Sequence, residues 1–271
     1  GAPGLALRSV TLTAKEKACL CKDADGHPSC LPEVCPYAKG YFDRVKDALA
    51  SLLDGAPQFS RAVLEETARQ FTVCPFELGL DLSAWCDVVI GDYNYLFDPV
   101  VRLHRFFDSA GDWLFLIDEA HNLPDRARAM YSAQFSKSSL TEAKRTLGKG
   151  KSPLKAALTR ADKAFLETRK QTAEQGGTAF LQELPAELLK PLHALQAPLQ
   201  DWLEQNPDAE AHAQLLDLYF AVQDITRAAE RYDEHFVTQL SAYGSDLTLQ
   251  LLCLDPVSYT HLRAHETEAD L

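Results

Sequence analysis

The segment WLFLIDEAHNL, residues 113–123, brings two carboxylates and a histidine to the end of an apolar run. Such a run predicts a buried strand, and ATP-driven motors hold magnesium and hydrolytic carboxylates where a strand of this kind ends. Asp118 is therefore a candidate Mg²⁺ ligand through water. Glu119 is a candidate base for the water that attacks the γ-phosphate of ATP, and His121 would couple this site to a second motor domain. The alternative is a strand end whose acids cap the next helix.

Six of the seven cysteines lie within the first 86 residues, and four of these have the spacing C-x10-C-x4-C-x38-C. Thiolates bind zinc or an iron–sulfur cluster, and the spacing alone does not separate the two. The long gaps favour a cluster, because zinc sites usually contain two tight cysteine pairs. Cys21 is an alternative to Cys19 as the first ligand, whereas Cys86 and Cys253 are expected in the core. The four candidate ligands are Cys19, Cys30, Cys35 and Cys74.

No phosphate-binding loop accompanies the carboxylates. The segment GKGKS, residues 148–152, ends like one, but Arg145 replaces the first glycine of the pattern and Pro153 follows where a helix should open. We therefore interpret it as a basic turn. The segment KDADG, residues 22–26, also fails as a calcium loop, because Cys21 stands at the first ligand position.

The segment GDYNYLFDP, residues 91–99, places aromatic residues and Asn94 after a second apolar run, with Arg102 shortly beyond. Aromatic rings beside cations suit stacking on single-stranded bases and holding phosphates. The alternative is structural. Tyr95 and Phe97 would then be core residues at strand spacing, followed by an Asp-Pro turn.

The chain of 271 residues has a net charge of −12 and 46 % hydrophobic residues, enough for a core in one large or two smaller domains. Residues 137–170 hold ten Lys or Arg against three acids, whereas residues 171–256 hold fourteen acids against three Lys or Arg. A local basic face is therefore possible in an acidic protein. With no apolar run of membrane-spanning length and no export leader, we expect a cytoplasmic protein without membrane contact.

Residue periodicity predicts strands and helices in the first half of the chain. A helix is expected over residues 37–53, with apolar residues on one face, and a second over residues 60–71 with Ser60 as N-cap. Two short apolar strands separated by a crossover suit a buried parallel sheet. The expected strands are residues 7–14, 87–93 and 113–118.

The second half has a different character. Residues 134–245 predict an almost entirely helical insertion, and the clearest amphipathic stripe runs over residues 209–243. Residues 247–256 then return to a strand. The last segment, residues 257–271, has no periodicity and resembles the in-frame translation of a sequencing adapter, so we exclude it from functional reasoning.

Together these blocks resemble the iron–sulfur superfamily 2 DNA helicases related to XPD and DinG, in their bacterial branch. Matching blocks include CLPEVCPYAKGYFDR, VCPFELGLDLSAW, DVVIGDYNYLFDP and LFLIDEAHNLPDRARAMYSA. They cover most of residues 8–133 plus 249–256, and the helical insertion matches only in position and character. The resemblance implies an α/β fold, in which a partial parallel-sheet, RecA-like motor domain is interrupted by a four-cysteine iron–sulfur domain and an all-helical arch insertion.

The resemblance also implies ligands and partners. The four candidate cysteines would hold a [4Fe–4S] cluster, the LIDEAH segment would bind ATP with Mg²⁺, and single-stranded DNA would thread past the arch with translocation 5′→3′. The implied division is residues 1–14 in motor domain 1, 15–85 in the iron–sulfur domain, 86–133 in motor domain 1, 134–246 in the arch, 247–256 as a return strand to the motor and 257–271 as non-native sequence. The implied DNA contacts are Lys15, Lys17, Lys39, Arg44, Tyr93, Asn94 and Arg102.

The phosphate loop and second motor domain of that family have no counterpart in this sequence. We therefore expect a fragment of an ATP-dependent DNA helicase that is monomeric and does not hydrolyse ATP by itself. Two other classes stay open. A non-enzymatic DNA-binding module would hold zinc in the thiols, and a redox or structural partner protein would use them as a labile sensor. Apolar edges of an incomplete sheet also predict aggregation.

Overall fold

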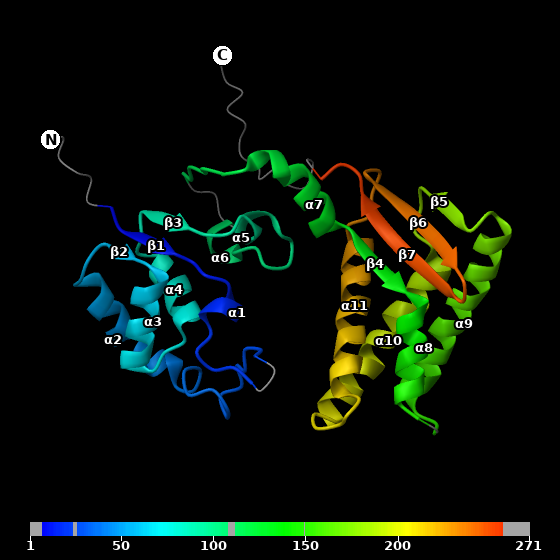
Figure 1. The fold of residues 1–271 in the computed structure, drawn as a ribbon, viewed down its shortest axis with the longest axis horizontal. Helices are drawn as coiled ribbons and strands as arrows, with labels where there is room; N and C mark the ends of the chain where they lie inside the picture. The colour runs from blue at the N-terminus through cyan, green and yellow to red at the C-terminus, as the bar shows by residue number, and fades with distance from the viewer. Residues whose placement is uncertain (1–6, 24–25, 108–111, 149, 257–271) are drawn as a thin grey trace, which may run out of the picture. The chain divides into compact units, whose positions relative to one another are not determined.

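The computed structural model describes residues 7–23, 26–107, 112–148 and 150–256, which fall into two compact units (Figure 1). The segment interpreted above as adapter sequence lies outside the described residues. No helix in the described ranges is both long and apolar enough to cross a membrane. Of the described residues, the first unit comprises 7–23, 26–96 and 101–107, and the second comprises 97–100, 112–148 and 150–256.

A three-stranded parallel sheet in the order β2-β1-β3 is the centre of the first unit. In its register Val10 pairs with Phe59 on one side and Val89 on the other, and the first two side chains are buried in the core. The strands predicted over residues 7–14 and 87–93 are confirmed, although both are shorter than expected. The predicted burial of the second is wrong, because Val88, Val89 and Ile90 are all exposed. The strands are β1 (Ser9–Thr11), β2 (Gln58–Phe59) and β3 (Val88–Ile90).

Short helices surround this sheet. The helix predicted over residues 60–71 is confirmed, and the Ser60 hydroxyl accepts a hydrogen bond from the Val63 amide at 3.5 Å. The helix predicted from residue 37 begins only at Tyr41, because Gly40 adopts a left-handed φ of 64° that a helix cannot continue through. The helices are α1 (Lys15–Ala18), α2 (Tyr41–Leu53), α3 (Arg61–Phe71), α4 (Pro75–Ser83), α5 (Asn94–Phe97) and α6 (His104–Phe107).

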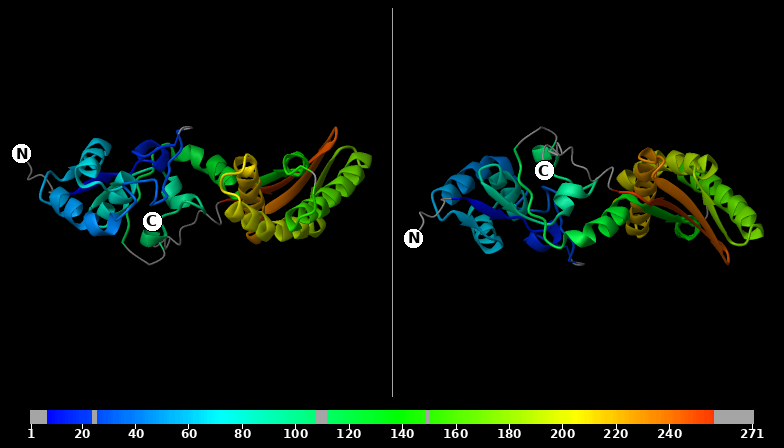
Figure 2. Two further views of the ribbon diagram at one scale, coloured as in Figure 1. Left: turned by 90° about the horizontal axis from the view of Figure 1, so that it is seen from below. Right: turned by 90° about the horizontal axis from the view of Figure 1, so that it is seen from above.

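The second unit is a two-layer structure in which helices cover one face of a four-stranded antiparallel sheet (Figure 2). The strand order is β4-β7-β6-β5. The strands are β4 (Ala133–Ser136), β5 (Thr178–Leu181), β6 (Phe236–Tyr243) and β7 (Asp246–Cys253). The helices of this layer are α8 (Lys137–Thr146), α9 (Pro153–Glu174), α10 (Ala186–Gln205) and α11 (His212–Glu230).

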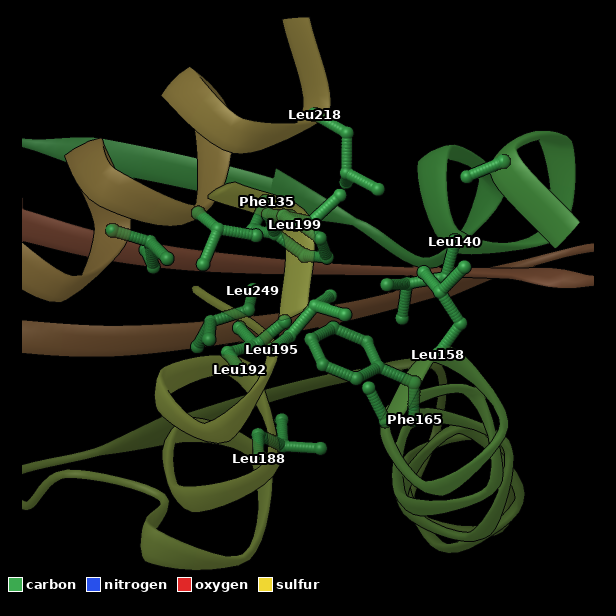
Figure 3. Close-up of a cluster of buried hydrophobic side chains, with 14 of the residues drawn as sticks. Phe135, Leu140, Leu158, Phe165, Leu188, Leu192, Leu195, Leu199, Leu218 and Leu249 are labelled. Carbon is green, nitrogen blue, oxygen red and sulfur yellow. The ribbon is translucent and has the colours of Figure 1, made fainter. Parts of the chain in front are cut away.

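Leucines fill the space between these two layers (Figure 3). In α10 the fully buried residues Leu188, Leu192, Leu195 and Leu199 recur at helical spacing and face the sheet. Phe165 of α9 packs among them, with its ring centroid 5.4 Å from that of Phe135 in β4. The result is one continuous core that the residues of the second unit build by themselves.

The predicted all-helical insertion is wrong, because the second unit contains a sheet. The helix expected over residues 209–243 ends at Glu230, and its last part is strand β6. Phe236, Thr238 and Leu240 are buried alternately, which is the period of a strand. Phe236 also fits the three-to-four spacing of the preceding helix, so the two periods overlap there. The run predicted as a return strand is β7, but its neighbours are β4 and β6 of this antiparallel sheet.

The buried strand predicted over residues 113–118 is also wrong. These residues form no strand, and the Leu114 and Leu116 side chains are 87 % and 91 % exposed. A strand exists only when a neighbour satisfies its N–H and C=O groups, and no strand in the described ranges pairs with this run. The short helix η1 (Ala120–Asn122) and α7 (Leu123–Tyr131) follow it directly.

Candidate functional site

Five cysteines of the first unit line one cavity of about 290 Å³. The structure thus brings the four predicted ligands to one place and adds the alternative first ligand to them. The thiols come from three parts of the chain, namely the end of α1, the turns that precede α2 and the start of α4. The five are Cys19, Cys21, Cys30, Cys35 and Cys74.

Local backbone geometry fixes two of these thiols near the start of the chain. Cys19 is the C-cap of α1, where its N–H donates to the Lys15 carbonyl, and its thiol donates to the Cys21 carbonyl at 2.9 Å. Cys35 is buried in a turn, and its N–H donates to the Leu31 carbonyl at 2.7 Å. Main-chain hydrogen bonds therefore hold both residues, and the Cys19 sulfur adds a further one.

Cys74 occupies the N-cap of α4, where the helix amides point toward its side chain. Pro75 follows as the first helical residue, a position at which its missing N–H costs nothing. Burial raises the pKa of the Cys74 thiol, while the backbone N–H groups of Glu77 and Phe76 act in the opposite direction. A bound metal would displace the thiol proton, and the amide donors would then stabilise the resulting Cys74 thiolate.

Lys15, predicted as a DNA contact, lines the thiol cavity instead of pointing away from it. Partial burial lowers the pKa of its ammonium, but the charge and hydrogen bond of Cys30, with Glu77 and Cys74, raise that pKa overall. The ammonium also lies 5.7 Å from the centre of the Phe76 ring. This arrangement places a positive charge at the cavity, where it would compensate thiolates that bind a metal.

Cys21 lines the cavity and interacts with three of the predicted ligands. Burial raises the pKa of its thiol, and a hydrogen bond with Cys35 and the charges of Cys35, Cys19 and Cys30 raise it further. The choice between Cys19 and Cys21 as the first ligand therefore stays open.

Three polar residues of the cavity wall were not marked in the sequence. The Tyr41 hydroxyl donates to Asp81 Oδ2 at 2.9 Å, and burial, together with that carboxylate, raises the pKa of Tyr41 strongly. Glu77 lies one turn before Asp81 on α4. The signal available in the sequence was this i, i+4 pair of acids beginning three residues after Cys74.

The spacing of the thiols bears on which metal they suit. Among the described residues, no three His, Cys, Asp or Glu side chains stand close enough together to hold a single metal ion. A zinc ion needs four such groups at about 2.0–2.3 Å from one centre. The five thiols line one cavity, and this grouping of soft ligands is compatible with zinc as well as with an iron–sulfur cluster.

The predicted catalytic residues lie together on one exposed turn of the second unit. The Glu119 N–H donates to Asp118 Oδ1 at 2.9 Å, and His121 Nε2 lies 3.3 Å from Glu119 Oε2. Glu119 has a left-handed φ of 51°, which is uncommon for a residue other than glycine. Neither η1 nor α7 receives a hydrogen bond from a capping side chain, so the geometry does not favour the capping alternative.

The other predicted DNA contacts lie in the first unit in different environments. Lys17 and Lys39 are exposed, whereas Tyr93, Asn94 and Arg102 are partly buried. The Arg44 guanidinium donates to backbone carbonyl groups on two segments of the chain. Surface exposure thus favours the two lysines as phosphate contacts over the partly buried residues.

The aromatic residues after β3 follow the structural alternative. Phe97 is buried, and Tyr95 packs against the core of the first unit. Burial raises the pKa of the Tyr95 hydroxyl, with Asp92 adding to the effect. Both residues lie in α5 rather than at strand spacing.

Comparison with known proteins identifies the relationship. The sequence pattern of the DEAD_2 family matches residues 5–140, which is half of the chain. This chain belongs to the DEAD_2 family. The matched DEAD_2 region contains the whole thiol cavity and the acidic turn, so the two candidate sites lie in the part of the chain that defines the family.

Two curated relatives of this DEAD_2 chain are similar to different lengths of it. It is 32 % identical over 84 residues to the Fanconi anemia group J protein homolog of Gallus gallus, covering 31 % of this chain and 7 % of that protein. It is 24 % identical over 234 residues to the general transcription and DNA repair factor IIH helicase subunit XPD/RAD3 of Saccharomyces cerevisiae, covering 86 % of this chain. The chain spans only 27 % of that yeast relative.

Two solved structures resemble the DEAD_2 chain at low similarity. An XPD helicase aligns with 92 % of this chain at 17 % identity and a TM-score of 0.45. The alignment includes 42 % of the XPD helicase chain. A truncated XPD aligns with 93 % of this chain at 16 % identity and a TM-score of 0.46. The alignment includes 68 % of the truncated XPD chain.

Proposed function

We propose that this chain is part of an ATP-dependent DNA helicase that moves 5′→3′ along single-stranded DNA. The observation that carries the proposal is the DEAD_2 match over residues 5–140, which includes both candidate sites. The yeast relative is by name a helicase subunit of a transcription and DNA repair factor. We further propose a monomer of the bacterial branch that works in the cytoplasm.

We infer that the thiol cavity holds a [4Fe–4S] cluster within an iron–sulfur domain of residues 15–85. A bound cluster would supply a rigid inorganic cross-link between chain segments that are otherwise joined only by loops and hydrogen bonds. The grouping of the cysteines around one cavity of about 290 Å³ supports a metal site, and the long gaps between them in the sequence favour a cluster over zinc. Lys15 offsets the negative charge of the thiolates. The proposed ligands are Cys19, Cys30, Cys35 and Cys74.

We infer that the acidic turn contributes to ATP hydrolysis in the full-length parent. Asp118 would hold Mg²⁺ through water, and Glu119 would orient and deprotonate the attacking water. The 3.3 Å contact between His121 and Glu119 would fix the direction of that carboxylate. A phosphate loop must come from another segment, so we expect no ATP turnover from the 271 residues alone.

We infer that DNA passes over the first unit beside the thiol cavity. Lys17 and Lys39 are exposed cations of this unit, and they lie close in sequence to Cys19 and Cys35. The DNA strand would also contact the turn and loop after β3, through Tyr93, Asn94 and Arg102. Residues 134–246, which belong to the second unit, would form the arch of the helicase, and residues 86–133 would belong to motor domain 1.

The colour and metal content of anaerobically purified protein test the cluster. We expect a brown protein with broad visible absorbance and with iron and acid-labile sulfide in equal amounts. A colourless protein with stoichiometric zinc would instead establish the non-enzymatic zinc module. Metal analysis separates these outcomes directly.

Binding to single-stranded DNA tests the partner. We expect a weak affinity that falls as the salt concentration rises, because phosphate contacts release counterions. Replacing Lys17 and Lys39 together with alanine should lower the slope of log affinity against log salt by about 1.4, at 0.7 for each lost contact to a single strand. Affinity that does not respond to salt would favour the redox partner protein.

A further inference from the structure

Arg44 makes more hydrogen bonds to the backbone than any other side chain that we describe in the first unit. It lies in the first turn of α2. Its Nη2 donates to the Lys39 carbonyl at 2.5 Å and to the Pro36 carbonyl at 3.1 Å. These two carbonyl groups belong to the turn that begins at Cys35.

The same guanidinium reaches a second segment. Nε donates to the Phe71 and Thr72 carbonyls at 3.1 Å each, and Nη2 donates to the Thr72 carbonyl at 2.7 Å. Thr72 is the C-cap of α3 and stands two residues before Cys74. Arg44 therefore connects the backbone beside the third predicted ligand to the backbone beside the fourth.

Two left-handed residues shape this contact. Thr72 has a φ of 55°, which is unfavourable for a β-branched residue and turns its carbonyl toward the guanidinium. Gly40 has a φ of 64°, and a Cβ atom there would lie 2.9 Å from Arg44 Nη1. Glycine at position 40 thus permits the turn and also leaves room for the arginine.

We propose that Arg44 is a positioning residue that sets the separation between the Cys35 turn and Cys74, and thereby the spacing of the thiol site. This inference rests on the proposed cluster, and it assigns Arg44 a role different from the phosphate contact expected above. A guanidinium has five N–H donors in a planar fork, which can serve carbonyl groups on two sides at once. A lysine ammonium keeps the charge but cannot span the same set.

The substitution Arg44→Lys separates the two roles. If Arg44 positions the thiols, the lysine variant should lose its cluster to a chelator about tenfold faster than the wild type, as for other residues that support metal ligands. Gly40→Ala should show the same direction of change, because it displaces the guanidinium. Lys46→Ala, at an exposed position of the same helix, is the matched control and should bleach at the wild-type rate.

Arg61 provides a graded comparison. Its Nη2 donates to the Lys17 carbonyl at 2.7 Å, close to the first ligand, but it reaches only that one backbone group. Arg61→Lys should therefore accelerate bleaching less than Arg44→Lys does. Equal rates for Arg44→Lys and the wild type, with weaker and less salt-dependent DNA binding in Arg44→Ala, would overturn the positioning role and restore the phosphate contact.

Hydrogen exchange in the metal-free chain gives a readout that does not depend on the cluster. The Val73 amide donates to the Ala68 carbonyl at 3.0 Å, in the segment that Arg44 holds. We expect this amide to exchange faster in Arg44→Lys than in Lys46→Ala, and unchanged exchange would contradict the proposal. Wild-type protein that takes up no iron would refute the cluster, while the exchange result would still decide whether Arg44 fixes this backbone.

Discussion

The thiol cavity and the acidic turn differ in how completely the described residues build them. The cavity has five thiols, a compensating cation and backbone groups that hold each segment. The acidic turn has its three predicted residues in contact, but Glu119 and His121 are 66 % and 73 % exposed. The apolar run before the turn is exposed as well. Local turns and helix ends are enough to bring the thiols together, whereas the acidic turn follows an apolar run that no strand in the described ranges pairs with.

The largest expected effect is at the thiol cavity. Cys35→Ser should abolish cluster binding, because Cys35 is the buried predicted ligand and a hydroxyl does not replace a thiolate for iron. Iron per chain, measured after anaerobic reconstitution, checks this result. Cys253→Ser is the matched control, since Cys253 is buried in the core beside α7 of the second unit and should leave the iron content unchanged. Iron retained in Cys35→Ser would mean that the ligand set is misassigned.

A second prediction concerns the acidic turn in the full-length parent. Glu119→Gln should lower ATP turnover by about 10²–10⁴-fold, because it removes the general base, while DNA binding stays near wild type. Steady-state hydrolysis assays measure the ATP turnover, and a binding titration measures the DNA affinity. Asp125→Asn, on the adjacent α7, is the control and should keep full turnover. Wild-type turnover in Glu119→Gln would exclude that carboxylate as the base.

A third prediction tests whether the two units are independent. Leu195→Ala should destabilise the second unit by about 2–5 kcal/mol, because it leaves a cavity in a fully buried part of the core. Urea unfolding measures the loss, and Leu166→Ala at a partly exposed position of α9 should cost much less. The iron content should stay unchanged in both variants. A parallel loss of iron would show that the thiol cavity depends on the second unit.

The smallest expected effect is the dependence of the second unit on pH. Asp246 accepts hydrogen bonds from the Ser136 hydroxyl at 2.7 Å and the Ser138 amide at 2.9 Å, and so holds the start of α8. Partial burial raises the pKa of Asp246, but hydrogen bonds from Ser136, Ser138 and Leu247 lower it overall. This stabilisation is therefore present above the ordinary aspartate pKa of about 3.9 and is lost as the pH falls through the lowered pKa.

Asp246→Asn should accordingly cost at most about 1 kcal/mol at neutral pH, because solvent partly screens the charge. The difference from wild type should vanish in acid, which urea unfolding at several pH values measures. Asp201→Asn at an exposed position of α10 is the control. A difference that persisted below the lowered pKa would mean that the Asp246 charge is not what stabilises α8.

Local signals predicted the first unit well and the second unit only in part. Ser60 began its helix as expected, and β1 and β3 formed where the apolar runs placed them. Cys74 and Cys35 are far apart in the sequence, yet both line one cavity. The family resemblance implied this proximity, whereas hydrophobic periodicity carries no information about it. The run at residues 113–117 failed because hydrophobicity predicts burial only where a neighbouring strand exists.

The remaining errors had identifiable physical causes. Phe236 satisfied a helical and a strand period at once, and Gly244, with a φ of 57°, marked the hairpin that decided between them. The proposed positioning role of Arg44 could not be predicted either, because an arginine that binds carbonyl groups and one that binds phosphates look the same in a sequence. Only the distances to Pro36 and Thr72 distinguish the two roles.

Iron and acid-labile sulfide in the anaerobically purified chain test the central claim most directly. A [4Fe–4S] cluster predicts about four irons and four sulfides per chain with visible absorbance that a reductant bleaches. One zinc per chain, without iron or sulfide, would contradict the account of the thiol cavity.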